Sequence, residues 1–200
     1  GYPVRALMPT APTITSRFWW ANGAWFDQGQ TGTCVGHGWA HWIEDGPVTW
    51  PGQVDPYGIY LAACLLDPWP GNDGGDLNFG TSVRAGAQAV VAMGKAVEYR
   101  WAFSAADVVD VLLLMGPVVI GSWWYESMFD PDENGLVQVD GNQAGGHCYV
   151  ANGVNTIKGL VRIKNSWGRE WGKKGHAYLS ISDLDGLIKD NGEACLAIEK

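Results

Sequence analysis

Cys34, His147 and Asn165 are residue types that could carry out nucleophilic chemistry if the fold brought them together. Cys34 follows the polar loop 27–33 at the predicted start of a helix. At a helix N-terminus, the helix dipole and the free backbone N–H groups favour a thiolate, so we expect a lowered thiol pKa. The alternative is that Cys34 is a small buried hydrophobic residue, as most free cysteines are. Position alone leaves both interpretations open.

His147 begins one predicted strand, and Asn165 ends the next. His147 follows two glycines and leads into an apolar run, and a lone histidine on a strand is more often structural than functional. Gly145 and Gly146, however, would let a substrate backbone come close. Asn165 stands where a strand ends in a turn. Neither residue establishes a site by itself.

Together, three segments resemble the papain family, the cathepsin-type cysteine proteases. Gln28 stands six residues before Cys34, and this stretch resembles the family segment that contains the oxyanion-hole glutamine and the nucleophilic cysteine. Residues 145–153 resemble the segment around the catalytic histidine, and residues 164–175, with Asn-Ser-Trp-Gly and a second Trp-Gly, closely match the asparagine segment. The order Cys, His, Asn agrees, and residues 80–84 resemble the middle of bacterial members. The similarity spans roughly residues 25–198.

The resemblance implies a cysteine endopeptidase with four catalytic residues. Cys34 would attack the peptide carbonyl as a thiolate and form an acyl-enzyme. His147 would hold the thiolate as an ion pair and then protonate the leaving amine. Asn165 would accept a hydrogen bond from the other imidazole nitrogen and orient the ring. Gln28 and the backbone N–H of Cys34 would donate to the oxyanion.

The resemblance also implies substrate-binding residues. Gly80 falls near the family's glycine that pairs with the substrate backbone, and Gly146 would border the same backbone. Trp123, on the strand after Pro117, would line or fill the main specificity pocket. Trp167 would cover the Asn–His hydrogen bond and exclude water. The expected substrate is a protein or peptide, with no metal and no cofactor.

The chain departs from the family pattern around the nucleophile. The usual C-G-[SA]-C-[WY] reads Thr31-Gly32-Thr33-Cys34-Val35 here, so a disulfide that the family often has is absent. Val35 replaces an aromatic residue, which alters packing behind Cys34. His147 follows Cys34 at less than the usual spacing of roughly 130–150 residues. These differences indicate a trimmed member with shorter loops.

Composition excludes several classes of protein. Hydrophobic residues make up 46% and charged residues 17% of the 200 residues, which is typical of a globular protein rather than a disordered one. The net charge of −8 argues against nucleic acid or an anionic membrane surface as a partner. No apolar run approaches the roughly 18 residues that membrane insertion requires. Twelve Trp and twenty-eight Gly beside seven Lys point to a bacterial or bacteriophage source.

The cysteines say little about the cellular compartment. If Cys34 stays free, the other three (Cys64, Cys148 and Cys195) allow at most one disulfide, and no C-x-x-C pair indicates zinc. A secreted or virion-associated location is favoured over a cytoplasmic one. Candidate partners outside this chain are an inhibitory propeptide or a particle protein.

Periodicity and caps predict an α+β protein with one catalytic domain over residues 1–200. We expect a helical lobe over residues 27–115 and a β-rich lobe, an antiparallel sheet or barrel, over 116–200 plus the N-terminal segment, with the site in the cleft between them. The predicted helices are 34–44, 55–66, 82–94 and 104–115. The predicted strands are 118–124, 135–139, 147–154, 160–165, 176–181 and 194–198.

Other interpretations remain at this point. Another Cys-His-Asn acyl transferase, such as a cell-wall amidase, and a protease-fold binding or structural component of a phage particle are the alternative functions. A metal site formed by Cys34 with His37 and His41 is conceivable but lacks further ligands. Residues 130–135 match the first half of a calcium loop, but position 141 is Gly where the loop needs Glu, so a polar turn is favoured.

Overall fold

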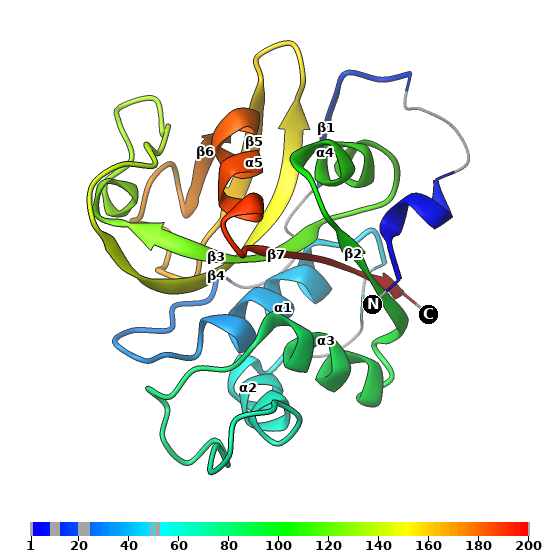
Figure 1. Ribbon diagram of the computed structural model, residues 1–200, viewed down its shortest axis with the longest axis vertical. Helices are drawn as coiled ribbons and strands as arrows, with labels where there is room; N and C mark the ends of the chain where they lie inside the picture. The colour runs from blue at the N-terminus through cyan, green and yellow to red at the C-terminus, as the bar shows by residue number, and fades with distance from the viewer. Residues whose placement is uncertain (1, 9–12, 20–24, 49, 51–52, 200) are drawn as a thin grey trace.

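The computed structural model describes residues 2–8, 13–19, 25–48, 50 and 53–199 (Figure 1). The helices are α1 (Cys34–Asp45), α2 (Pro56–Cys64), α3 (Val83–Ala92), α4 (Ala105–Leu114) and α5 (Ile181–Lys189), with short 3-10 turns at η1 (Val4–Leu7) and η2 (Glu126–Phe129). The strands are β1 (Ser16–Phe18), β2 (Ala96–Ala102), β3 (Val118–Tyr125), β4 (Gln143–Asn155), β5 (Leu160–Lys164), β6 (His176–Ser180) and β7 (Glu193–Glu199).

All strands belong to one antiparallel sheet. Its order is β2-β7-β3-β4-β5-β6, and the short β1 pairs with the far end of β4. In the β3–β4 register, Ser122 lies opposite His147 and Trp123 lies opposite Gly146. The cleft-facing ends of β3 and β4 are therefore held to each other by the backbone ladder.

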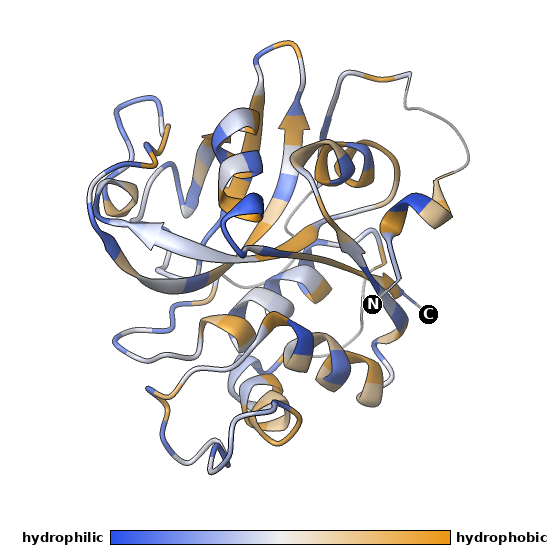
Figure 2. Ribbon diagram, viewed as in Figure 1, coloured by the Kyte–Doolittle hydropathy of each residue, from blue (hydrophilic) through white to orange (hydrophobic). Residues whose placement is uncertain are grey.

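The sheet separates two hydrophobic cores. Alternation along β3 sends Val118 and Ile120 into a core shared with α4 and α5, and sends Val119 into a core shared with α1 and α3. Figure 1 shows α1, α2 and α3 on one side of the sheet and α4 and α5 on the other. Figure 2 shows hydrophobic stretches on the strands between these helical layers. This arrangement confirms the predicted α+β class.

Local capping signals begin three of the helices, as predicted from the sequence. The Asp55 carboxylate accepts a hydrogen bond from the Tyr57 N–H at 3.0 Å, and Pro56 occupies the first turn of α2. The hydroxyl of Ser82 accepts from the Ala85 N–H at 3.1 Å, and that of Ser104 accepts from the Asp107 N–H at 3.2 Å. These short-range contacts satisfy N–H groups that the first turn leaves unpaired.

One predicted strand is wrong, β2 and α5 were not predicted, and one predicted helix packs in the other lobe. Residues 96–102, inside the stretch expected to be helical, form β2 and pair with β7. Helix α4 packs on the sheet and shares the core of the β-rich part rather than that of α1–α3. Residues 135–139 form no strand: they make only an isolated bridge to β6, because the Asp132 carboxylate holds the chain in a turn. Helix α5 lies in a segment for which no element was predicted beyond residue 181.

The polar turn predicted at residues 130–135 is present. The carboxylate of Asp132 accepts from the N–H groups of Asn134 and Leu136, both at 2.8 Å, and Gly135 has φ of +79°. In the described part of the chain, none of the helices has the length and apolar character needed to span a bilayer.

Candidate active site

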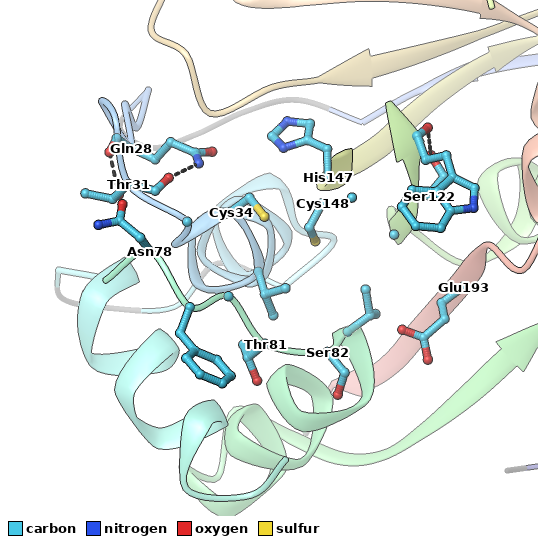
Figure 3. A pocket seen from close by; sticks show the side chains of 18 of the residues that line it. Gln28, Thr31, Cys34, Asn78, Thr81, Ser82, Ser122, His147, Cys148 and Glu193 are labelled. Atoms are coloured by element: carbon cyan, nitrogen blue, oxygen red, sulfur yellow. Dashed lines mark hydrogen bonds between the residues drawn. The ribbon is translucent and has the colours of Figure 1, made fainter. Parts of the chain in front are cut away.

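A cleft of about 590 Å³ runs between the start of α1 and the adjoining ends of β3 and β4 (Figure 3). Six of the residues singled out in the sequence line it, namely Gln28, Cys34, Gly80, Trp123, Gly146 and His147. Asn165 and Trp167 lie behind the imidazole instead, in contact with it rather than with the cleft. The structure therefore brings all eight residues to one place, although they come from segments far apart in the chain.

Cys34 is the first residue of α1 and is partly exposed on the floor of the cleft. Burial raises the pKa of its thiol, while the backbone N–H groups of Cys148, Val35 and Cys34 lower it by a smaller amount. The prediction of a lowered pKa was wrong in its net direction. The helix N-terminus does favour the thiolate, but the loss of water around the sulfur outweighs it.

His147 stands on β4 with one ring nitrogen committed to Asn165. Its Nε2 lies 2.7 Å from the Asn165 Oδ1, an amide oxygen that can only accept, so Nε2 carries the hydrogen. In the neutral ring, Nδ1 is then the free acceptor. Figure 3 shows the imidazole across the cleft from the Cys34 sulfur. Burial lowers the pKa of His147 to about 4, and the hydrogen bond with Asn165 opposes that shift.

Two tryptophans enclose the imidazole. Trp167 stacks on it, with ring centroids 4.7 Å apart and planes 24° apart, and Trp124 meets it edge-on at 4.9 Å. Trp124 is buried and also contacts Trp167 edge-on. These rings keep water away from the His147–Asn165 hydrogen bond, which strengthens it. Trp124 was not predicted as part of the site, although the alternation along β3 had set it on the same face as Ser122.

Asn165 is fully buried and fixed by its neighbours. Its Oδ1 also accepts from the Ser166 N–H at 2.8 Å, and its own N–H donates to the Gly175 carbonyl at 3.1 Å. Next to it, Lys164 forms an ion pair with Asp45 of α1 at 2.7 Å, and both side chains are inaccessible to solvent. The end of β5 is thus tied to the C-terminal end of the helix that carries Cys34.

Gln28 is held from both ends of its amide group. The Ser166 hydroxyl donates to its Oε1 at 2.6 Å, and its Nε2 donates to the Thr31 carbonyl at 2.6 Å. A backbone hydrogen bond from the Gln28 N–H to the Ser166 carbonyl, at 2.8 Å, reinforces the contact. Because an amide NH₂ has two hydrogens, one stays available to an oxygen in the cleft. The role of Ser166 was missed because it depends on a residue 138 positions away.

Two glycines shape the walls of the cleft on either side of Cys34. Gly80 has φ of +79°, which favours glycine, and the Gly32 N–H donates to the Leu77 carbonyl at 2.7 Å, joining the two loops. A Cβ at Gly146 would meet no atom within 4 Å, so the cleft is open beside His147. Gly146 is exposed beside the cleft, whereas the Gly80 carbonyl already accepts from Asn72 Nδ2 at 2.9 Å.

The histidines considered as metal ligands have other partners. His37 Nδ1 lies 3.0 Å from the Thr33 carbonyl, and His41 Nε2 accepts from the Phe26 N–H at 3.2 Å. The residues that the structure describes contain no group of three or more His, Cys, Asp or Glu side chains arranged to hold a metal ion. All four cysteines are free thiols.

Comparison with solved structures assigns the architecture. The structure superimposes on xylellain, a cysteine protease from Xylella fastidiosa, with a TM-score of 0.79 and 16% identity over 100% of this chain and 91% of that one. The fold is papain-like. Procathepsin L 3 from the larval midgut of Tenebrio molitor gives a TM-score of 0.68 at 16% identity, over 95% of this chain and 71% of that one. A cysteine protease of Carica candamarcensis in complex with E-64 gives a TM-score of 0.68 at 16% identity, over 94% of this chain and 99% of that one.

Sequence comparison adds nothing to this papain-like fold: no family model and no curated protein matches the chain. The fold predicted from the motifs is confirmed. At 16% identity the likeness concerns architecture, so the activity has to be argued from the residues of the cleft.

Proposed function

We propose that the protein is a cysteine endopeptidase that uses Cys34 as nucleophile and His147 as base. The observation that carries the proposal is the 2.7 Å hydrogen bond between His147 Nε2 and Asn165 Oδ1. It leaves Nδ1 as the proton acceptor in a cleft that Cys34 also lines. A nucleophile, a base and a group that orients the base are the parts that acyl transfer requires.

The first half of the reaction forms an acyl-enzyme. Burial disfavours a lone thiolate and a lone imidazolium alike, so each charge is favoured only beside the other. As the sulfur attacks the peptide carbonyl, the thiol proton moves to His147 Nδ1, and the two charges form together and attract each other. A C–S bond forms, and the carbonyl oxygen becomes an oxyanion.

The oxyanion is stabilised by two donors, the Cys34 backbone N–H and the free amide hydrogen of Gln28. Collapse of this intermediate breaks the C–N bond, and His147 gives its proton to the leaving amine. A water molecule then attacks the thioester while His147 takes up one of its protons. Release of the carboxylic acid returns the proton to Cys34 and restores the starting state.

Gly80, Gly146 and Trp123 are the proposed substrate contacts. Both glycines line the cleft, where an extended peptide would form main-chain hydrogen bonds. Trp123 is 38% exposed on the cleft wall, so its ring is accessible to a substrate side chain. If Trp123→Ala leaves the cleavage preference unchanged, this assignment is wrong.

The test is labelling by a peptidyl epoxide or vinyl sulfone across pH 4 to 9. We expect one label per chain at Cys34, none in Cys34→Ala, and a strongly reduced rate in His147→Ala. Labelling no faster than that of a free thiol would contradict the proposal and favour a binding or structural role. Amide release from peptidoglycan without cleavage of peptides would favour the cell-wall amidase.

A further inference from the structure

Two thiols meet beside the imidazole of His147. Cys34 begins α1, and Cys148 follows His147 on β4. Both line the cleft, and Cys34 packs against the hydrophobic core to which Cys148 belongs (Figure 3). The proposed reaction uses the thiol of Cys34 and leaves that of Cys148 without a role.

The backbone brings the two sulfur atoms within reach of each other. The Cys148 N–H donates a hydrogen bond to the Cys34 sulfur. Because an amide nitrogen is only two bonds from the Cβ of its own residue, the atom that carries the second sulfur is also close to the first. On the helix side, a Cβ at Gly38 would lie 2.8 Å from the Cys148 Sγ. Gly38 follows Cys34 by one turn on the same helix face, so its missing side chain leaves the space that the Cys148 sulfur fills.

Cys195, another buried thiol of this core, is too far away to bond with Cys148. In the sheet, Cys148 of β4 lies opposite Gly121 of β3, and Cys195 of β7 lies opposite Val119 of β3. Because β3 runs between them, their backbones are two strand spacings apart, roughly 10 Å. A disulfide needs Cα atoms within about 7 Å of each other. Cys34 is therefore the partner that the sheet leaves to Cys148.

The surroundings of the two thiols also set the order in which they react. Cys34 is partly exposed in the cleft, with His147 there to accept its proton. Cys148 is buried, and burial raises the pKa of its thiol well above the ordinary value. Oxidants act on accessible sulfur that is readily deprotonated, so Cys34 reacts first.

We propose that Cys148 is a resolving cysteine, which closes a reversible disulfide with Cys34 when a peroxide enters the cleft. The bond requires only the two thiols, whereas its effect on catalysis rests on the proposed endopeptidase function. In the disulfide, Cys34 has no free sulfur with which to attack a carbonyl. It is also protected from the sulfinic and sulfonic acids, which simple thiols do not reduce.

The reaction has two oxidation steps and one reduction. The Cys34 sulfur attacks hydrogen peroxide, the O–O bond breaks, and the thiol proton passes through His147 to the leaving oxygen, which gives a sulfenic acid and water. The Cys148 sulfur then attacks the Cys34 sulfur, the S–O bond breaks, and the Cys148 proton leaves with the hydroxide as a second water. The two sulfurs together lose two electrons, which the peroxide gains. A dithiol returns two electrons and two protons and restores both thiols.

The experiment treats wild-type protein with a slight excess of hydrogen peroxide, blocks the remaining thiols and maps the cysteine peptides by mass spectrometry. We expect one pair of peptides joined through Cys34 and Cys148, lighter by two hydrogen atoms than the reduced pair and separated by dithiothreitol. Labelling of Cys34 by the peptidyl epoxide should fall at least about tenfold after peroxide and return after dithiothreitol, because only the free sulfur reacts.

Cys148→Ala separates the resolving role from the oxidation of Cys34 alone, with each variant compared to itself before peroxide. Its sulfenic acid has no partner, so dimedone should trap it, and prolonged exposure to peroxide should cause a loss of labelling that dithiothreitol does not reverse. Cys195→Ala removes another buried thiol of the same core and is the matched control, which should recover as the wild type does.

The outcomes distinguish this inference from the proposed reaction. Absence of the joined pair in the wild type, a bond from Cys34 to Cys64, or equal recovery with and without Cys148 would overturn the role of Cys148, whatever the protein does to peptides. A disulfide between Cys34 and Cys148 in a protein that neither cleaves peptides nor reacts with the epoxide would keep the resolving role and overturn the endopeptidase.

Discussion

His147 Nε2 and Asn165 Oδ1 lie 2.7 Å apart, and that hydrogen bond determines which imidazole nitrogen faces the cleft. It joins β4 to the end of β5, beneath the stacked ring of Trp167. Because Asn165 is anchored through the Gly175 carbonyl and the Ser166 N–H, it has little freedom to follow the imidazole if the ring turns. The base is thus oriented by the sheet rather than by its own side-chain preference.

Replacing Asn165 by alanine should lower kcat/KM by about 5- to 30-fold, the range for loss of about one to two kcal/mol of buried hydrogen bonding. The imidazole would lose its orienting partner and sample rotations in which Nδ1 no longer faces Cys34. Peptide hydrolysis under pseudo-first-order conditions measures the change. Asn142→Ala, at an exposed position, is the control. Equal activity of the two variants would show that Asn165 has no orienting role.

Ser166→Ala should reduce kcat by roughly tenfold with little change in KM, because Ser166 acts on the oxyanion donor rather than on substrate binding. Without its hydroxyl, the Gln28 amide loses the 2.6 Å hydrogen bond to Oε1 and can rotate. The decisive comparison is the double variant with Gln28→Ala. We expect it to be no slower than Gln28→Ala alone, since both changes act through one group. Additive losses would mean that Ser166 acts elsewhere.

The acid limb of activity should lie near pH 4. His147 must be neutral to accept the thiol proton, and its pKa is lowered to about 4 by burial, from an ordinary value of about 6.5. A lowered pKa extends the neutral form toward acid, so activity is retained as pH falls through 6 and is lost as pH falls through the lowered pKa. The rate of inactivation by a peptidyl epoxide, measured against pH, tests this. An acid limb at about 6.5 would contradict it.

Asp45→Asn should destabilise the protein by about 3–5 kcal/mol, because it leaves the buried Lys164 ammonium without its counter-charge. Asp45 Oδ2 also accepts from Asn152 Nδ2 at 2.7 Å, so a second buried group loses its partner. Urea unfolding gives the free energy. The control is Lys189→Gln, which breaks the exposed pair with Asp185 and should cost at most about 1 kcal/mol.

The double variant Asp45→Leu with Lys164→Met sharpens that prediction. It removes both charges, so it should lose less stability than Asp45→Asn. A double variant that is less stable than Asp45→Asn would contradict this. It would show that the ion pair itself stabilises the fold, rather than only preventing an unpaired buried charge.

Local chemistry in the sequence determined much of the helical framework. Asp55-Pro56, Ser82 and Ser104 start helices by contacts within four residues, so their effect can be read without the rest of the chain. A similar signal at Ser180, whose hydroxyl accepts from the Asp183 N–H, starts α5 and was overlooked. The motifs around Cys34, His147 and Asn165 also predicted the fold, and the solved structures confirm that architecture.

Strands and the finer parts of the site depended on tertiary structure. Whether residues 96–102 or 135–139 become a strand depends on a partner elsewhere, and β7 pairs only with the first of these segments. Ser166 contacts Gln28, and Glu193 lines the same cleft as Cys34. In both cases, most of the chain separates the residues that the fold brings together. Tertiary structure also decided the net pKa shifts of Cys34 and His147. Residue type and helix position indicate which charges are favoured, but burial depends on everything packed around the group.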